Sequence, residues 1–209
     1  SIESHQELMQ VINDTDKDAK IDVKGGTIIS DKYCLIPSDL RDINQLAANL
    51  DKARLDPQAP TFVLMECVMA YLEGEATKKL LRWITHKFDT CALVIYDMVG
   101  PNDPFGQQLV LNVQSRGCPL PGIRSFPSVE SHLNLMWQGG FDASGTSSMR
   151  EVYEKYIEAK ERERVERIEP LDEFEEWNLI MSHYCISYGV KGNTSLLADS
   201  GLPLPYSLT

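Results

Sequence analysis

Acidic residues stand shortly after three apolar segments of the chain, where a parallel sheet would place residues that contact a ligand. These residues are Asp39, Glu66 and Asp97. A carboxylate at such a position can accept hydrogen bonds from a ribose, an amine or an adenine amino group, or it can cap the following helix. Each acid taken alone is more typical of a structural role, whereas the three together favour a nucleotide-like ligand.

Other combinations of reactive side chains are weaker. Cys67 and His183 could act as a thiol nucleophile and its base. However, Cys67 lies in an apolar stretch, which is typical of an inert buried cysteine, and His183 lies in an apolar and aromatic segment, which is typical of a core histidine. The remaining histidines are scattered and indicate no metal cluster: His5, His86 and His132. The sequence has no G-x-G-x-x-G, Walker A or G-x-S-x-G motif.

Strand-like and helix-like segments alternate along the chain. The predicted strands are 33–37, 61–65, 90–96, 141–147 and 182–190, and the predicted helices are 1–12, 44–52, 75–88, 107–116, 129–137, 149–164 and 170–181. Segment 61–65 has five residues without a charge, which predicts a strand buried on both faces of a parallel sheet. The alternation is typical of an α/β sheet with crossover helices.

Composition limits the classes of protein to which the chain can belong. Its 209 residues are 43% apolar, so it can build a core, and 20 Lys and Arg against 31 Asp and Glu give a formal charge of −11. That charge disfavours non-specific binding to nucleic acid or anionic membrane. The longest apolar run, 61–70, is too short to span a bilayer. Five cysteines, an odd number without a C-x-x-C spacing, favour a reducing compartment such as the cytoplasm over a disulfide framework or a structural zinc site.

Four strings in order closely resemble leucine carboxyl methyltransferase. They are SDLRDINQL from Ser38, PTFVLMECVMAYL from Pro60, NDPFGQQLVLN from Asn102 and RIEPLDEFEEWNLIMSHYC from Arg167. The resemblance runs from near Ser1 to about Gly192. It implies an α/β, Rossmann-like sheet of the class I methyltransferases with helices on both faces and antiparallel last strands. It also implies that the enzyme uses S-adenosylmethionine to methylate the C-terminal leucine of the catalytic subunit of type 2A protein phosphatase.

The resemblance carries over onto individual residues. Asp39 and Leu40 match the pair that holds the adenine, and Glu66 matches a further acid that contacts the cofactor. Tyr71 matches a tyrosine near the substrate carboxylate. Where the family usually reads Tyr-Glu-Gln, this chain has Tyr-Asp-Met from Tyr96, so the resemblance assigns no role to Asp97.

Such chemistry needs few groups from the protein. A terminal carboxylate, with an ordinary pKa of about 3.3–3.7, is already ionised at neutral pH and needs no general base. The methyl group of a sulfonium is a strong electrophile that needs no metal. Catalysis then consists of alignment and exclusion of water.

Two other functions remain open. A paralogous methyltransferase of tRNA wybutosine synthesis shares much of the pattern, but it normally continues into a long repeat domain and would be expected to show a basic face. The third reading is a non-catalytic binding module of the same fold.

The resemblance also indicates a missing front segment. The family begins with a first strand, a Gly-rich turn and a second strand, and its sheet order is 3-2-1-4-5-7-6. The sequence is therefore expected to hold the C-terminal portion of one methyltransferase domain, residues 1–192, followed by an irregular tail, residues 193–209.

Overall fold

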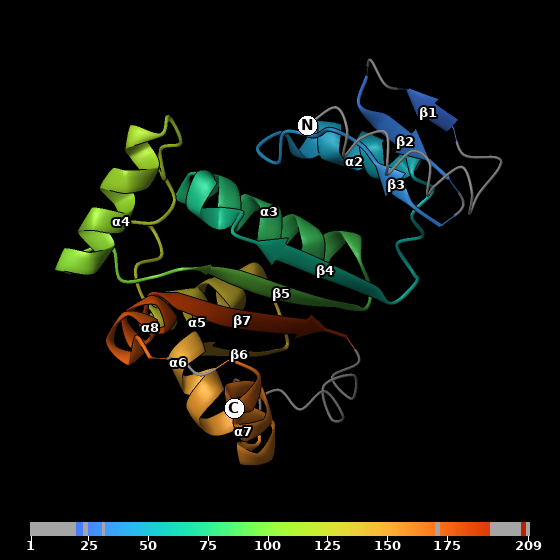
Figure 1. Ribbon diagram of the computed structural model, residues 1–209. Coiled ribbons are helices and arrows are strands. Elements are labelled where there is room, and N and C mark those ends of the chain that lie inside the picture. The colour runs from blue at the N-terminus through green and yellow to red at the C-terminus, as the bar shows by residue number, and fades with distance from the viewer. Residues whose placement is uncertain (1–19, 23–24, 31, 170–171, 193–205, 208–209) are drawn as a thin grey trace. The chain divides into compact units, whose positions relative to one another are not determined.

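The computed structural model describes residues 20–22, 25–30, 32–169, 172–192 and 206–207 (Figure 1). The chain divides into unit 1, Ser1–Asp56, and unit 2, Pro57–Thr209. The predicted helix 1–12 and most of the predicted tail 193–209 lie outside the described residues, so the domain boundary at residue 192 stays a prediction.

The described part of unit 1 contains a small antiparallel sheet and one helix. The sheet is formed by β1 (Lys20–Asp22), β2 (Thr27–Ile29) and β3 (Cys34–Leu35), in that order. The helix is α2 (Ile43–Lys52), and Asp42 caps it by accepting a hydrogen bond from the Gln45 backbone N–H at 3.0 Å. The predicted strand 33–37 is thus reduced to two residues, and it pairs with β2 rather than with a parallel sheet.

Unit 2 is built on a mixed sheet of five strands in the order β4-β5-β7-β6-β8. The strands are β4 (Thr61–Glu66), β5 (Cys91–Met98), β6 (Ala143–Ser148), β7 (Tyr184–Lys191) and β8 (Tyr206–Ser207). β4 is parallel to β5, and β7 lies antiparallel to both β5 and β6. The order β4-β5-β7-β6 reproduces the 4-5-7-6 end of the predicted series, and the α/β fold class is confirmed.

Helices connect the strands of this sheet. They are α3 (Gly74–Lys87), α4 (Pro104–Ser115), α5 (Val129–Gly139), α6 (Met149–Glu151), α7 (Ala159–Ile168) and α8 (Phe174–Ser182). The described residues also include a 3₁₀-helical turn, η1 (Met69–Tyr71), and a π-helical segment, η2 (Val152–Tyr156). Figure 1 shows β5 between β4 and β7, with α5 behind the sheet.

One face of the sheet carries the core. Cys91, Leu93 and Ile95 alternate along β5 and are each fully buried. α5 covers this face, because its His132 lies 3.5 Å from the sulfur of Cys185 in β7. Close approach at the same face explains a glycine, since a Cβ at position 189 would collide with the ring of Phe141.

The other face of β4 is open, which corrects the sequence-based prediction for 61–65. Phe62 is 65% exposed and Leu64 59% exposed, whereas Met65 is buried. Burial on both faces was wrong for this strand because an uncharged run records only that apolar side chains are present, and not whether both faces are covered.

The predicted helix 149–164 is interrupted. α6 is followed directly by η2, which ends at Tyr156, and the next residue, Ile157, has an extended backbone (φ −86°, ψ 124°) before α7 begins. Exposed charges pair four residues apart in this region, between Lys155 and Glu151 at 2.7 Å for example. Exposed pairs of this kind contribute too little free energy to impose a continuous helix.

His132 should make the stability of unit 2 sensitive to acid. Its side chain is 1% exposed, and burial lowers its pKa to about 4 from an ordinary value near 6.5. Because the pKa is lower in the folded state, stability is retained above pH 6.5 and lost as the pH falls toward 4, by up to about 1.4 kcal/mol per pH unit.

This pH dependence can be measured as the free energy of unfolding in denaturant, for the intact wild-type protein and for His132→Leu, at pH 7, 5.5 and 4. We expect the wild type to lose about 3 kcal/mol more than the variant between pH 7 and pH 4. Equal losses would show that the folded state does not hold His132 neutral.

Candidate functional site

Glu66 ends β4 at the carboxyl edge of the two parallel strands. It pairs in register with Tyr96 of β5, and the Cys67 N–H donates to the Tyr96 carbonyl at 2.8 Å. The backbone of Glu66 is therefore fixed by the ladder, while its side chain is exposed. Ligands of open α/β sheets bind beyond this edge.

The chain turns sharply after Glu66 and presents Tyr71. Cys67 has a positive φ of 51°, which is uncommon for a residue with a Cβ, and η1 follows directly. Met69 and Ala70 are 2% and 1% exposed, whereas Tyr71 is 47% exposed. Two buried residues thus anchor the turn, and the tyrosine ring beside them remains accessible.

Asp97 lies beneath this turn and not on the surface. Its side chain is 1% exposed and accepts hydrogen bonds from the backbone N–H groups of Met69, Ala70 and Met98 at 2.8, 3.2 and 2.8 Å. Burial raises the pKa of the Asp97 carboxyl, and the three N–H groups oppose that rise. Unlike Glu66, this post-strand acid is enclosed by protein.

Two tyrosines that sequence reasoning missed stand on the same face as Glu66. Tyr96 and Tyr184 stack with their ring centroids 5.2 Å apart and an angle of 11° between planes. The register places Glu66 opposite Tyr96, and Tyr184 opposite Met98, two residues further along β5. Burial is the main cause that raises the pKa of both phenols, so they remain neutral donors. Only the pairing of β5 with β7 reveals this neighbourhood.

The thiol–imidazole alternative is not formed. Nε2 of His183 lies 2.9 Å from the Asp103 carboxylate, and Nδ1 lies 2.7 Å from the Leu179 carbonyl, so both ring nitrogens have partners other than Cys67. Burial raises the pKa of the Cys67 thiol, and the charges of Asp97 and Glu66 raise it further. Cys67 therefore stays protonated, as the inert reading of this cysteine predicts.

Asp39 and Leu40 lie in unit 1, ahead of α2. The Asp39 carboxylate accepts hydrogen bonds from Nε, Nη2 and the backbone N–H of Arg41, at 2.7–2.9 Å for the shortest contact of each. The Arg41 side chain is the main cause that lowers the pKa of Asp39 to about 2. The carboxylate is thus ionised and oriented, and Leu40 beside it is half-buried.

The four residues expected at the site therefore fall into two local pairs. Glu66 and Tyr71 lie at the two ends of the β4–η1 turn in unit 2, and Asp39 and Leu40 are consecutive residues of unit 1. Within the described ranges, no group of three or more His, Cys, Asp or Glu side chains is arranged to hold a metal ion. In the same ranges, no helix has the length and apolar character needed to cross a bilayer.

Comparison with known proteins gives a consistent set of relatives. A leucine carboxyl methyltransferase homologue of Arabidopsis thaliana is 35% identical over 183 residues, which is 88% of this chain and 55% of that protein. The leucine carboxyl methyltransferase 1 of Bos taurus is 33% identical over 90% of this chain and 57% of its own length. The tRNA wybutosine-synthesizing protein 4 of Homo sapiens is 39% identical over 78% of this chain and 24% of its own length. The chain spans little more than half the length of these two leucine carboxyl methyltransferase relatives.

Solved structures are more distant. A phosphoethanolamine N-methyltransferase of Haemonchus contortus aligns with a TM-score of 0.37 and 16% identity, over 63% of this chain and 33% of that one.

The family model for leucine carboxyl methyltransferase matches residues 10–85, a range that contains Asp39, Leu40, Glu66 and Tyr71. Together with relatives about 35% identical over most of its length, this match places the chain in the leucine carboxyl methyltransferase family.

Proposed function

We propose that the intact protein methylates the C-terminal leucine carboxylate of the type 2A protein phosphatase catalytic subunit, with S-adenosylmethionine as the methyl donor. The observation that carries this proposal is the β4–η1 turn, where an exposed carboxylate ends the strand and an exposed phenol follows five residues later at the end of η1. Both side chains occur in the string ECVMAY, from Glu66 to Tyr71, which belongs to the part of the chain that matches the family.

The two carboxylates predicted to bind the cofactor have the chemistry that it requires. When bound, S-adenosylmethionine supplies a methyl group on a positively charged sulfur. Glu66 offers an exposed carboxylate, which suits the hydroxyl and amino groups of a nucleoside and the positive charge of a sulfonium. In unit 1, Asp39 offers a carboxylate that Arg41 already orients. To accept from an adenine amino group, its oxygens must share their remaining lone pairs with that guanidinium.

The acceptor requires positioning more than activation. A leucine carboxylate is ionised at neutral pH, so no residue of the protein has to remove a proton from it. The Tyr71 hydroxyl can donate a hydrogen bond to one carboxylate oxygen and leave the other available for attack. Holding the attacking oxygen in line with the methyl carbon accounts for much of the rate that such an enzyme needs.

The similarity to the wybutosine enzyme makes tRNA the alternative acceptor. That relative is as similar in sequence as the protein methyltransferases are. The formal charge of −11 favours a peptide acceptor, because binding of tRNA depends on basic side chains that neutralise phosphates.

Transfer of radiolabelled methyl groups by the intact protein separates these acceptors. We expect label on a peptide with the phosphatase C-terminal sequence and a free leucine carboxylate. We expect none on the same peptide ending in leucine amide, which lacks the ionised oxygen. Label on tRNA but not on the peptide would contradict the proposal, and binding of the peptide without transfer to either acceptor would favour the non-catalytic module.

Glu66→Gln should weaken cofactor binding in the intact protein while leaving its folding unchanged. A neutral amide keeps the size of the side chain but loses the charge-assisted hydrogen bonds, so we expect S-adenosylhomocysteine to bind at least about tenfold more weakly by isothermal titration. Because Glu66 is exposed, its substitution should shift the free energy of unfolding by less than about 0.5 kcal/mol.

Glu75→Gln provides the control for this substitution. Glu75 is an exposed glutamate of α3 that pairs with Lys78 on the helix surface. We expect the Glu75→Gln variant to bind S-adenosylhomocysteine with the affinity of the wild type. A Glu66→Gln protein with wild-type affinity would remove Glu66 from the site.

A further inference from the structure

We infer that Asp97 is a positioning residue for the methyl acceptor: from the buried end of β5 it holds the η1 turn, and thereby fixes where Tyr71 stands. The role of Tyr71 in this inference rests on the proposed function. The contact between Asp97 and the turn does not, because it is a property of the fold.

The carboxylate supplies a cap that the turn itself lacks. The first N–H groups of any helical turn have no partner within it. The residue at the cap position of η1 is Val68, which has no side chain able to accept a hydrogen bond. One oxygen of Asp97 accepts from both Met69 and Ala70, 28 and 27 residues earlier in the chain. A neighbouring strand therefore does what a Ser or Asp at position 68 would do locally.

A second contact holds the turn from the other side. The Gly122 N–H donates to the Ala70 carbonyl at 3.0 Å. The approach is so close that a Cβ at position 122 would collide with the carbonyl oxygens of Met69 and Leu72. The side chains nearby form one buried cluster, which consists of Ala70, Met98, Leu120 and Ile123. The residue before Tyr71 is thus held through both its N–H and its carbonyl.

Glu66 is held independently of Asp97. Its backbone is part of the β4–β5 ladder, and the next N–H, that of Cys67, donates to the Tyr96 carbonyl. Loss of the Asp97 contacts should therefore displace Tyr71 and leave Glu66 in place. An Asp97 substitution should therefore affect the positioning of the acceptor without affecting the binding of the cofactor.

The energetics fit positioning better than stabilisation alone. Since burial raises the pKa of Asp97, its favourable contribution to stability is present at acid pH and is lost as the pH rises through the raised pKa. A buried charge is weak evidence of a stabilising role. It does fix the direction of three N–H groups more strongly than a neutral acceptor would.

Hydrogen exchange in the intact protein tests the contact itself. In Asp97→Asn one neutral oxygen remains for the turn, and we expect the Met69 and Ala70 amides to exchange about tenfold faster than in the wild type. In Asp97→Ala the increase should be larger. The exchange rates of the Leu93 and Ile95 amides, inside β5, should be unchanged in Asp97→Asn. If the Met69 and Ala70 amides exchange at the same rate in the wild type and in both variants, the inference is overturned. This measurement needs neither cofactor nor acceptor.

Binding and kinetics test the consequence for Tyr71. We expect Asp97→Asn to bind S-adenosylhomocysteine within twofold of the wild type, and to lose at least tenfold in kcat/KM for the leucine-ended peptide. On a Tyr71→Phe background the same Asp97 substitution should cost less than twofold, because coupled residues are not additive. Full additivity, or a loss of cofactor affinity equal to the loss of kcat/KM, would contradict positioning through Tyr71.

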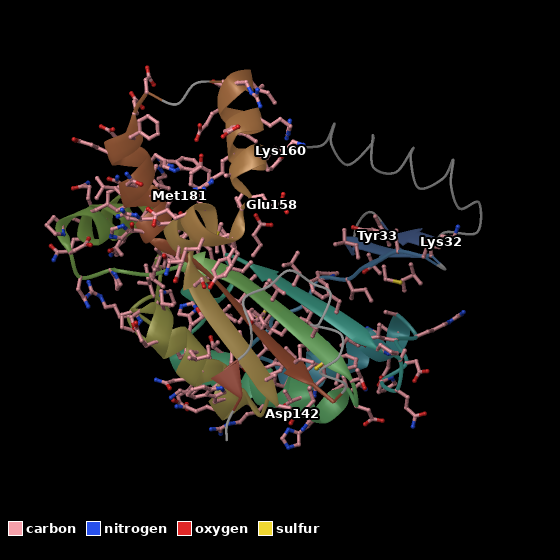
Figure 2. The ribbon with its side chains drawn as sticks, turned by 90° about the horizontal axis from the view of Figure 1, so that it is seen from below. Lys32, Tyr33, Asp142, Glu158, Lys160 and Met181 are labelled. Atoms are coloured by element: carbon pink, nitrogen blue, oxygen red, sulfur yellow. The ribbon has the colours of Figure 1, made fainter. Side chains whose placement is uncertain are left out.

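Asp142→Asn is the matched control. The Asp142 carboxylate also accepts a backbone N–H, that of Gly192, at 2.8 Å. It lies at the end of the sheet away from Met181 and the start of β7, as Figure 2 shows. In Asp142→Asn the exchange rates of the Met69 and Ala70 amides, the affinity for S-adenosylhomocysteine and kcat/KM should match those of the wild type. A wild type that methylates no acceptor would refute the proposed function, while the exchange rates would still decide the role of Asp97.

Discussion

The pairing of β5 on both sides is the constraint on which unit 2 depends. β5 is parallel to β4 on one side and antiparallel to β7 on the other, and its inward residues are fully buried beneath the helical layer. The parallel pair brings the carboxyl ends of β4 and β5 to one edge, which is where Glu66 and Asp97 lie. The antiparallel neighbour brings the start of β7, with Tyr184, to that same edge. One arrangement of three strands therefore assembles the candidate site.

The two acids at this edge are used in opposite ways. Glu66 points from the open face of β4 and remains accessible. Asp97 points into the core, where its carboxylate accepts hydrogen bonds from backbone N–H groups. The difference follows from the alternation of side chains along a strand, because residues on opposite faces of one sheet meet either solvent or core. Asp39 in unit 1 is a third case, since its charge is stabilised on the surface by Arg41, which lowers its pKa. Acids at similar positions in the sequence pattern thus have three different electrostatic environments.

The thiol and imidazole side chains near this edge are engaged by their surroundings rather than activated. The thiol of Cys67 is kept protonated by burial and by adjacent negative charge, and the ring of His183 is engaged with Asp103 and Leu179. What the site offers is a carboxylate, neutral phenols and a firmly held turn. In the proposed function these groups bind and orient the reactants, which is what transfer of a methyl group to an already ionised oxygen requires.

The sequence by itself determined the α/β class, the positions of most strands and helices, and the family, because uncharged runs, helical periodicity and the string ECVMAY are local properties of the chain. It also placed Glu66 at a strand end. Only the tertiary structure decided that Phe62 and Leu64 are exposed, that Asp97 is enclosed beneath η1 and that Tyr96 stacks on Tyr184. Those features depend on which strands become neighbours and which face a helix covers, and such contacts join residues dozens of positions apart that no local pattern relates.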